Sequence, residues 1–249
     1  MMNLSTLTVP EDLREAVRGA DRNRDLVQQP VSVNPAWWQE RLPTAGLAAR
    51  SGTDVLPRDD LFGLGRGAQH STDGALELLW ACLSWGTGKT QRNNGQRIEA
   101  VARTSGATDK LCKAAGISTS SPKEAYEVLR PQKNAVPYLG PPFFTKFLYF
   151  AGGGDVDHPS LILDSRVAAS LARHGWKGLA GTYWWPATTY DRYCTLVRRW
   201  AEELTHQDGV VATPDQIELW LFRGSDPDNS GEEAAGDPSR DPGPVAEQD

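Results

Sequence analysis

The feature that most constrains the fold is a succession of apolar residues at helical spacing that begins near Gly74 and runs to Arg223. Residues three and four apart share one face of an α-helix, so such a pattern indicates helices that bury one side. The clearest stripes predict a helix with Leu76, Leu79, Trp80 and Leu83, a second with Ile98, Val101 and Ala102, and further helices over Lys123–Leu129, Phe143–Phe150, Ser165–His174, Tyr190–Leu204 and Pro214–Arg223. Strand signals are sparse. The sequence therefore predicts a mainly α-helical fold.

Composition divides the chain into three predicted parts. Residues 1–70 are mixed, with a helix-like Glu11–Arg18 and a loop-like Gly63–Gly67, and we expect them to form an N-terminal extension that contributes to a helical lobe. Residues 71–224 form the helical core. Residues 225–249 combine Pro, Gly, Ser and acidic residues with almost no large apolar side chains, a composition typical of disordered segments. We expect a disordered acidic tail there.

The charge distribution is uneven. The net charge is −6, but Ser225–Asp249 holds eight acidic residues and only Arg240 as a basic one, so the remainder is close to neutral. Between Lys89 and Lys177 there are thirteen Lys and Arg residues against seven Asp and Glu residues. This local positive excess is compatible with contact to a phosphate backbone, and equally with an ordinary solvated surface.

Other sequence features limit the classes of protein to which the chain can belong. No run approaches the roughly 18–20 consecutive apolar residues of a membrane span, and the start lacks a secretory pattern. The three cysteines Cys82, Cys112 and Cys194 lie far apart, and neither they nor the four histidines show metal-ligand spacing. We expect a cytoplasmic protein with reduced thiols and no catalytic metal.

The segment with the most chemical information is Tyr138–Phe150, in which a Gly/Pro turn opens a helix that carries Lys146 among phenylalanines. A second helix is expected to begin at Asp164, eighteen residues later. Apolar surroundings disfavour a charged amine, and a neutral amine is the form that acts as a nucleophile. Taken singly, Lys146 is also explained as a lysine at the edge of an amphipathic helix, and Asp164 as a helix cap. The pair at this spacing favours a catalytic interpretation.

This pair resembles the helix-hairpin-helix superfamily of DNA glycosylases, and within it the 8-oxoguanine DNA glycosylases, especially the compact archaeal type. The resemblance covers roughly residues 76–223 and implies a two-lobed helical fold with a cleft, with residues 71–224 as the glycosylase core. It implies that Lys146 is the nucleophile, that Asp164 is its carboxylate partner, and that the enzyme has an associated lyase activity without a cofactor. It also implies a monomer that acts on double-stranded DNA containing an oxidised purine, associated with the nucleoid. The family hairpin usually reads Gly-hydrophobic-Gly where this chain has Pro142, Phe143 and Phe144, which puts the hairpin's phosphate contact in doubt.

The same resemblance implies positions for the contacts with DNA. Arg92 and Asn93 stand where the family fills the gap left by a flipped base, and Arg97 stands where it reads the orphaned cytosine. A plain Gly/Asn loop with an exposed arginine is an equally good interpretation of this segment. Position in the hairpin and at the start of the following helix adds Gly140, Thr145 and Arg166 as expected DNA contacts.

The last predicted helix supplies the expected base pocket. Glu218 and Phe222 are four residues apart and so share one helix face, as do the polar base reader and aromatic stacker of the family. A carboxylate accepts both donors of a guanine edge while the ring stacks on the base; core packing of Phe222 and solvation of Glu218 are the alternatives. Phe150 is expected to line the same pocket. Two functions remain open beside excision of 8-oxoguanine: excision of another damaged or modified base, and a non-catalytic DNA-binding module.

Overall fold

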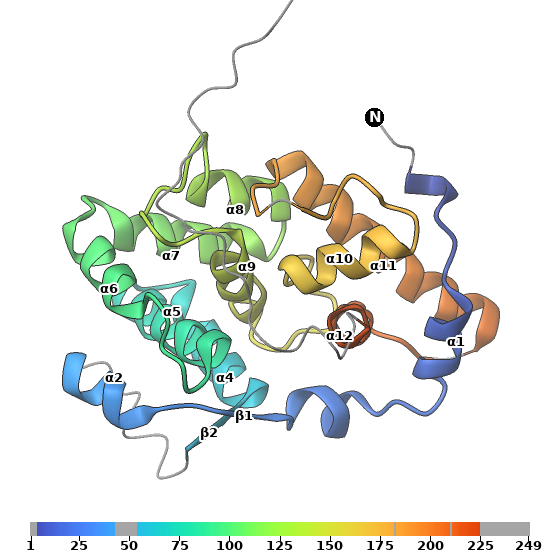
Figure 1. Ribbon diagram of the computed structural model, residues 1–249, viewed down its shortest axis with the longest axis horizontal. Coiled ribbons are helices and arrows are strands. Elements are labelled where there is room, and N and C mark those ends of the chain that lie inside the picture. The colour runs from blue at the N-terminus through green and yellow to red at the C-terminus, as the bar shows by residue number, and fades with distance from the viewer. Residues whose placement is uncertain (1–3, 43–53, 182, 210, 225–249) are drawn as a thin grey trace, which may run out of the picture.

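The computed structural model describes residues 4–42, 54–181, 183–209 and 211–224, and these segments fold mainly into α-helices (Figure 1). The prediction of a mainly α-helical fold is confirmed. The described elements are η1 (Leu4–Thr6), α1 (Glu11–Val17), the π-helical turn η2 (Asn23–Val27), β1 (Pro30–Ser32), α2 (Pro35–Arg41), β2 (Val55–Pro57), α4 (Arg58–Ala68), α5 (Thr72–Thr87), α6 (Asn94–Arg103), α7 (Ala107–Ser118), α8 (Pro122–Leu129), α9 (Pro141–Phe150), α10 (Ser165–Arg173), α11 (Ala187–Asp208) and α12 (Pro214–Arg223). Strands β1 and β2 form a short antiparallel pair with Val31 opposite Leu56. The predicted acidic tail, residues 225–249, lies outside the described residues.

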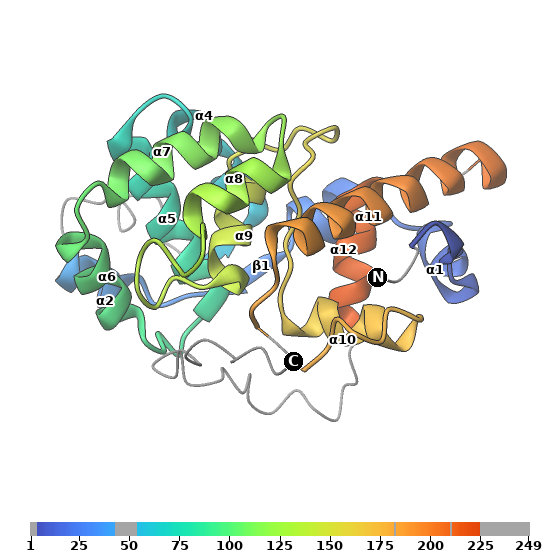
Figure 2. The ribbon, with the colours of Figure 1, turned by 90° about the horizontal axis from the view of Figure 1, so that it is seen from above.

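The helices gather on two sides of α9. Figures 1 and 2 show α4 to α7 on one side and α1, α10, α11 and α12 on the other. The packing agrees with this view, because α9 contacts α4, α5, α7 and α8, whereas α12 contacts α1, α10 and α11. Contacts between α8 and α11 join the two groups. The lysine-bearing helix α9 is thus held in the middle of the molecule.

Helix starts follow local sequence rules. The Ser71 side chain accepts a hydrogen bond from the Gly74 amide at the start of α5, which satisfies one of the free N–H groups of the first turn. Helix α12 begins with a capping box between Thr213 and Gln216 and has Pro214 in its first turn. Each helix predicted from an apolar stripe is present, with ends within a few residues of the prediction.

The loop predicted at Gly63–Gly67 is wrong, since these residues belong to helix α4. Gly65 serves close packing. A Cβ atom added at Gly65 would lie 1.9 Å from the carbonyl oxygen of Phe150, at the end of α9. Only a residue without a side chain allows the two backbones to approach so closely. Gly65, one of the residues that suggested a loop, instead allows α4 to pack against α9.

The N-terminal segment belongs to the same hydrophobic core as the rest of the described chain. Leu13, Leu26 and Trp38 are buried in it together with side chains of α5, α9 and α11. Arg22 further joins this segment to α12 through a two-pronged hydrogen bond with Asp215, at 3.2 and 2.7 Å. The segment therefore helps to place α12, which faces α9.

Within the described ranges, no helix has both the length and the apolar character needed to cross a membrane.

Candidate active site

Lys146 and Asp164 meet in the interior. The Nζ atom of Lys146 donates hydrogen bonds to Asp164 Oδ2 at 3.2 Å and to the carbonyl oxygen of Pro142 at 2.9 Å. The two residues are 5% and 2% exposed. A buried ion pair is a poor source of stability because both charges lose their hydration, so its presence favours a functional explanation.

Asp164 has two tasks, one for each carboxylate oxygen. Oδ1 accepts hydrogen bonds from the amides of Arg166 and Val167 and thereby caps α10. Oδ2 faces Lys146. The capping interpretation and the catalytic one are therefore compatible, since the cap fixes the side chain in the orientation that presents Oδ2 to the amine.

Three buried hydroxyl groups hold the segment that precedes Asp164. The hydroxyl groups of Tyr190 and Tyr193, on α11, donate to the carbonyl oxygens of Leu161 and Ile162 at 2.8 and 2.7 Å. Thr145, on α9, accepts a hydrogen bond from the Leu163 amide at 3.1 Å. Among the described residues no strand pairs with this segment, and the hydroxyl groups replace the hydrogen bonds that a neighbouring strand would supply.

Thr145 was expected to contact DNA, and the structure places it elsewhere. Its side chain is fully buried, and its hydroxyl group lies 2.7 Å from the Pro141 carbonyl oxygen and contacts both the amide and the carbonyl of Leu163. A group enclosed in this way has no access to a phosphate. Thr145 instead connects the helix of Lys146 to the segment that positions Asp164.

The surroundings of Lys146 differ in detail from the aromatic setting expected. The ring centre of Phe143 lies 5.9 Å from Nζ, whereas the rings of Phe144 and Phe150 pack against Tyr126 and Trp85. The lysine stem instead passes Gly86 of α5, where an added Cβ would lie 3.2 Å from the lysine Cδ. The absence of a side chain at this position leaves room for the extended lysine.

A cavity of about 210 Å³ opens beside the pair. It is smaller than the roughly 300–1,000 Å³ typical of pockets for drug-sized ligands. Its wall comes from the turn after η2, from β1, α4, α5 and α9, from the segment before α10, and from α12. Its lining residues include Gln29, Arg58, Trp85, Gly86, Lys146, Asp164, Glu218 and Phe222. The space suits one heterocyclic base better than a larger cofactor.

Glu218 and Phe222 both line this cavity, as the sequence predicted for the base pocket. Glu218 is 1% exposed and pairs with Arg58, whose Nη1 donates to Glu218 Oε2 at 3.1 Å. Burial raises the pKa of Glu218 to about 7, and the charge of Arg58 opposes this rise.

The guanidinium of Arg166 lies 4.2 Å from the ring centre of Phe222 and so covers part of that ring. Phe150 is fully buried and packs behind Trp85, so it supports the cavity wall and is not part of its lining.

A third ion pair joins Arg22 and Asp215 next to the cavity wall. The Tyr149 hydroxyl group donates to Asp215 Oδ2 at 3.0 Å, and Asp215 is also held by Arg22. Burial alone raises the pKa of Asp215, but the hydrogen bonds and charge of Arg22 outweigh it, so the pKa lies below its ordinary value. The guanidinium of Arg58 lies 5.4 Å from the Tyr149 ring centre. Charged and hydroxyl groups thus continue from the cavity to η2.

The expected DNA-contacting loop lies between α5 and α6. Arg92 is exposed and Asn93 is partly exposed, with Asn93 in the left-handed region at φ 60°. Arg97 is buried, and its guanidinium donates to the carbonyl oxygens of Arg92 and Tyr138 at 2.7 and 3.1 Å. The donors that would read a cytosine are used to join this loop to the turn before α9. Gly140, in that turn, is partly exposed and caps the start of α9 with its carbonyl oxygen.

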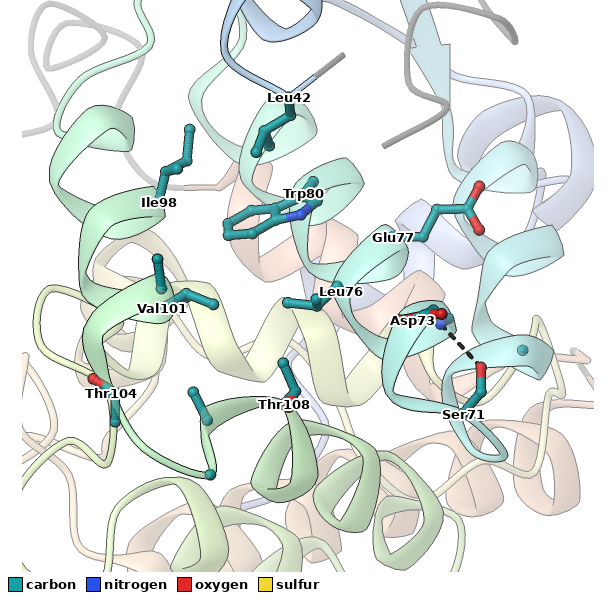
Figure 3. Close-up of a pocket in the computed structure, with 15 residues that line it drawn as sticks. Leu42, Ser71, Asp73, Leu76, Glu77, Trp80, Ile98, Val101, Thr104 and Thr108 are labelled. Atoms are coloured by element: carbon teal, nitrogen blue, oxygen red, sulfur yellow. Dashed lines mark hydrogen bonds between the residues drawn. The ribbon is translucent and has the colours of Figure 1, made fainter. Parts of the chain in front are cut away.

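A larger hollow lies away from the Lys146 pair (Figure 3). Its volume is about 1,010 Å³, and apolar side chains of α5 and α6 line it, among them Leu76, Trp80, Ile98 and Val101. Glu77 and Asp73 lie on its other side (Figure 3). Neither Lys146 nor Asp164 lines it, so the smaller cavity is the candidate active site. The described residues contain no cluster of three or more His, Cys, Asp or Glu side chains able to hold a metal ion.

Sequence reasoning missed the contribution of residues 1–70. Gln29 and Arg58 line the cavity, and Arg22 anchors the helix that carries Glu218. A weak signal existed for Arg58, because it follows Pro57 at the first position of a helix, where the helix dipole disfavours a positive charge. Gln29 and Gly86 carry no local signal, because their importance arises only when distant segments meet.

Comparisons with known proteins support the same class of site. Searches against curated proteins and against solved structures gave no significant match. A family model described as "Putative 8-oxoguanine DNA glycosylase OGG-like protein" matches residues 24–222, about four-fifths of the chain. The matched region includes the Lys146–Asp164 ion pair and the cavity wall from Gln29 to Phe222, with Arg58 in it. The chain belongs to this OGG-like family.

Proposed function

We propose that this protein excises 8-oxoguanine, or a closely related oxidised purine, from double-stranded DNA through a Schiff base on Lys146, and that it then cleaves the strand by β-elimination. One observation carries the proposal. Lys146 and Asp164 meet at 3.2 Å in the wall of a cavity sized for a single base, in a member of an 8-oxoguanine glycosylase family.

The chemistry assigns one step to each group. The amine of Lys146, once deprotonated, attacks the sugar C1′ of a flipped nucleotide, and the bond from C1′ to the base nitrogen breaks. The base leaves with that electron pair and takes up a proton. Asp164 accepts the amine proton or stabilises the positive charge that develops on the sugar. The sugar ring then opens to an imine between Nζ and C1′.

The imine accounts for the strand cleavage. Loss of a proton from C2′ and departure of the 3′ phosphate constitute the β-elimination, and water then releases the sugar from Lys146. Asp164 lies close enough to Nζ to take part in these proton transfers. All of these steps use groups of the chain, the DNA and water.

Base selection is assigned to α12. The Watson–Crick edge of guanine offers two adjacent donors, and an ionised Glu218 is an acceptor only. Phe222, one turn further along the helix, offers a ring face for stacking. The exposed Arg92 and the partly exposed Asn93, with Arg166 beside the cavity, are proposed to contact the duplex from which the base is flipped.

Borohydride trapping tests the proposal. The protein is incubated with duplexes that contain 8-oxoguanine opposite each of the four bases, and sodium borohydride reduces any imine to a stable covalent link. We expect a trapped complex with the full chain and none with Lys146→Gln. Lys123→Gln is the matched control, because Lys123 lies on α8 with its side chain 44% exposed and should leave trapping unchanged.

Each outcome has a defined meaning. If a complex is trapped only on a different lesion, the proposed mechanism stands and the proposed identity of the excised base is wrong. Trapping that persists in Lys146→Gln would remove this lysine from the nucleophile role. Binding of DNA without trapping or excision on any lesion would favour a non-catalytic DNA-binding module.

A further inference from the structure

Arg58 is a buried cation at the edge of the candidate base pocket. It is 3% exposed, and its guanidinium lies 5.2 and 5.4 Å from the ring centres of Trp85 and Tyr149. It is the first residue of α4, where the helix dipole disfavours a positive charge. Enclosing this charge with that of Glu218 removes hydration from both groups, and such pairs seldom stabilise a fold. A functional role therefore explains the burial of Arg58 better than a contribution to stability does.

The geometry leaves one oxygen of Glu218 available to a ligand. Arg58 Nη1 donates to Oε2 at 3.1 Å. The other oxygen, Oε1, receives no hydrogen bond from the part of the chain that the structure describes, and Glu218 lines the cavity beside Lys146. Because Glu218 lines the cavity, this second oxygen can accept a hydrogen bond from a donor that a ligand brings.

We propose that Arg58 is a positioning residue of the base pocket: it holds Glu218 as an ionised acceptor with Oε1 free for the base. The pocket is thereby restricted to purines with two adjacent N–H donors on the Watson–Crick edge. This inference rests on the proposed function, since it requires that the cavity receives a flipped base. Arg58 itself contacts Glu218 and not the reacting atoms.

The surrounding charges explain why Arg58 is needed. Glu218 faces Arg58 from α4, Lys146 and Tyr149 from α9, Asp164 from the start of α10, and Tyr193 from α11. Lys146 is already paired with Asp164, so its charge offers Glu218 little net attraction. Asp164 repels a second carboxylate. Arg58 is therefore the counter-charge that Glu218 depends on.

Protonation of Glu218 would change the pattern of hydrogen-bond donors and acceptors that the pocket recognises. A neutral carboxyl group carries one donor and one acceptor, which matches the mixed edge of an adenine-type base and mismatches the two donors of guanine. Burial and Asp164 favour the neutral form, and Arg58 opposes them. Removal of Arg58 should thus raise the pKa of Glu218, so that its carboxyl group stays neutral up to a higher pH.

The test compares base excision with reaction at a site that has no base. Single-turnover excision of 8-oxoguanine and 8-oxoadenine is measured from pH 5.5 to 9.5, and borohydride trapping on abasic-site DNA reports Lys146 independently of base reading. For the unaltered chain we expect excision of 8-oxoguanine to rise with pH through the neutral range. For Arg58→Met we expect this rise to occur at a pH higher by one unit or more. We also expect the preference for 8-oxoguanine over 8-oxoadenine to fall about tenfold or more.

Further variants keep the inference testable. Arg58→Lys retains a cation and should restore part of the preference. If Arg58→Met fails to fold, Arg58→Met/Glu218→Gln removes both buried charges and is compared with Glu218→Gln. We expect equal preferences in these two, because Arg58 is proposed to act by keeping Glu218 ionised and glutamine does not titrate. A further loss in the double variant would overturn this action through the charge of Glu218. An unchanged pH profile and preference in Arg58→Met would overturn it as well, whereas absence of trapping in the unaltered chain would refute the proposed function instead.

Discussion

At the scale of single residues, Asp164 shows how one side chain serves both fold and chemistry. Oδ1 accepts from two backbone amides of α10, and Oδ2 faces the amine of Lys146. The cap is local, so the sequence could predict it from an aspartate before an apolar stripe. The ion pair depends on tertiary packing, and the spacing to Lys146 predicted it only in combination with the family resemblance.

The two tasks of Asp164 can be separated by substitution. Asp164→Asn keeps an oxygen for the cap and loses the carboxylate, whereas Asp164→Ala loses both. We expect excision to fall about 10²–10⁴-fold in both variants. In urea denaturation, Asp164→Ala should be less stable than Asp164→Asn by about 1 kcal/mol, the usual value of an N-cap. Equal stability of the two variants would show that the cap contributes nothing here.

At the scale of elements, α4 shows why sequence signals can mislead. Three glycines within five residues suggested a loop, but in the fold they lie on a helix that packs against α9. The periodic stripes of the other helices were reliable because each reflects burial of one face. Gly65 reflects a backbone contact with Phe150, which no pattern within α4 can reveal.

Two glycines of α4 provide a matched pair of variants. Gly65→Ala places a Cβ atom against the carbonyl oxygen of Phe150 and should destabilise the protein by about 1–3 kcal/mol, as overpacking does. At Gly67 an added Cβ meets nothing within 4 Å, so Gly67→Ala should be neutral or stabilise by up to about 1 kcal/mol. Urea denaturation midpoints check both values, and a Gly65→Ala variant as stable as the unaltered chain would contradict the close approach of α4 and α9.

At the scale of the whole molecule, the candidate active site is assembled from segments far apart in the sequence. Gln29, Arg58, Lys146 and Glu218 line one cavity although up to 189 positions separate them. The residues on α9 and α12 could be predicted, because each lies in a helix with its own motif. The contribution of residues 1–70 could not, because it depends on how that segment crosses the molecule between α1 and α2 (Figure 1).

The same assembly makes stability depend on pH. Burial raises the pKa of Glu218 in the folded protein to about 7 from the ordinary 4.5, with Arg58 acting in the opposite direction. A raised carboxyl pKa means that the folded state binds this proton more tightly than the unfolded chain does. The corresponding stability is fully present below pH 4.5 and is lost as the pH rises through 7.

Glu218→Gln tests this linkage, because glutamine resembles the neutral carboxyl group at every pH. We expect the variant and the unaltered chain to have similar free energies of unfolding at pH 5. At pH 8 the variant should be the more stable by an amount on the order of 3 kcal/mol or less, even though it lacks the charge that pairs with Arg58. Glu127→Gln, at an exposed position on α8, is the control and should show little pH-dependent difference. If the unaltered chain instead gains stability relative to Glu218→Gln between pH 5 and pH 8, the buried Arg58–Glu218 pair contributes net stability and needs no functional explanation.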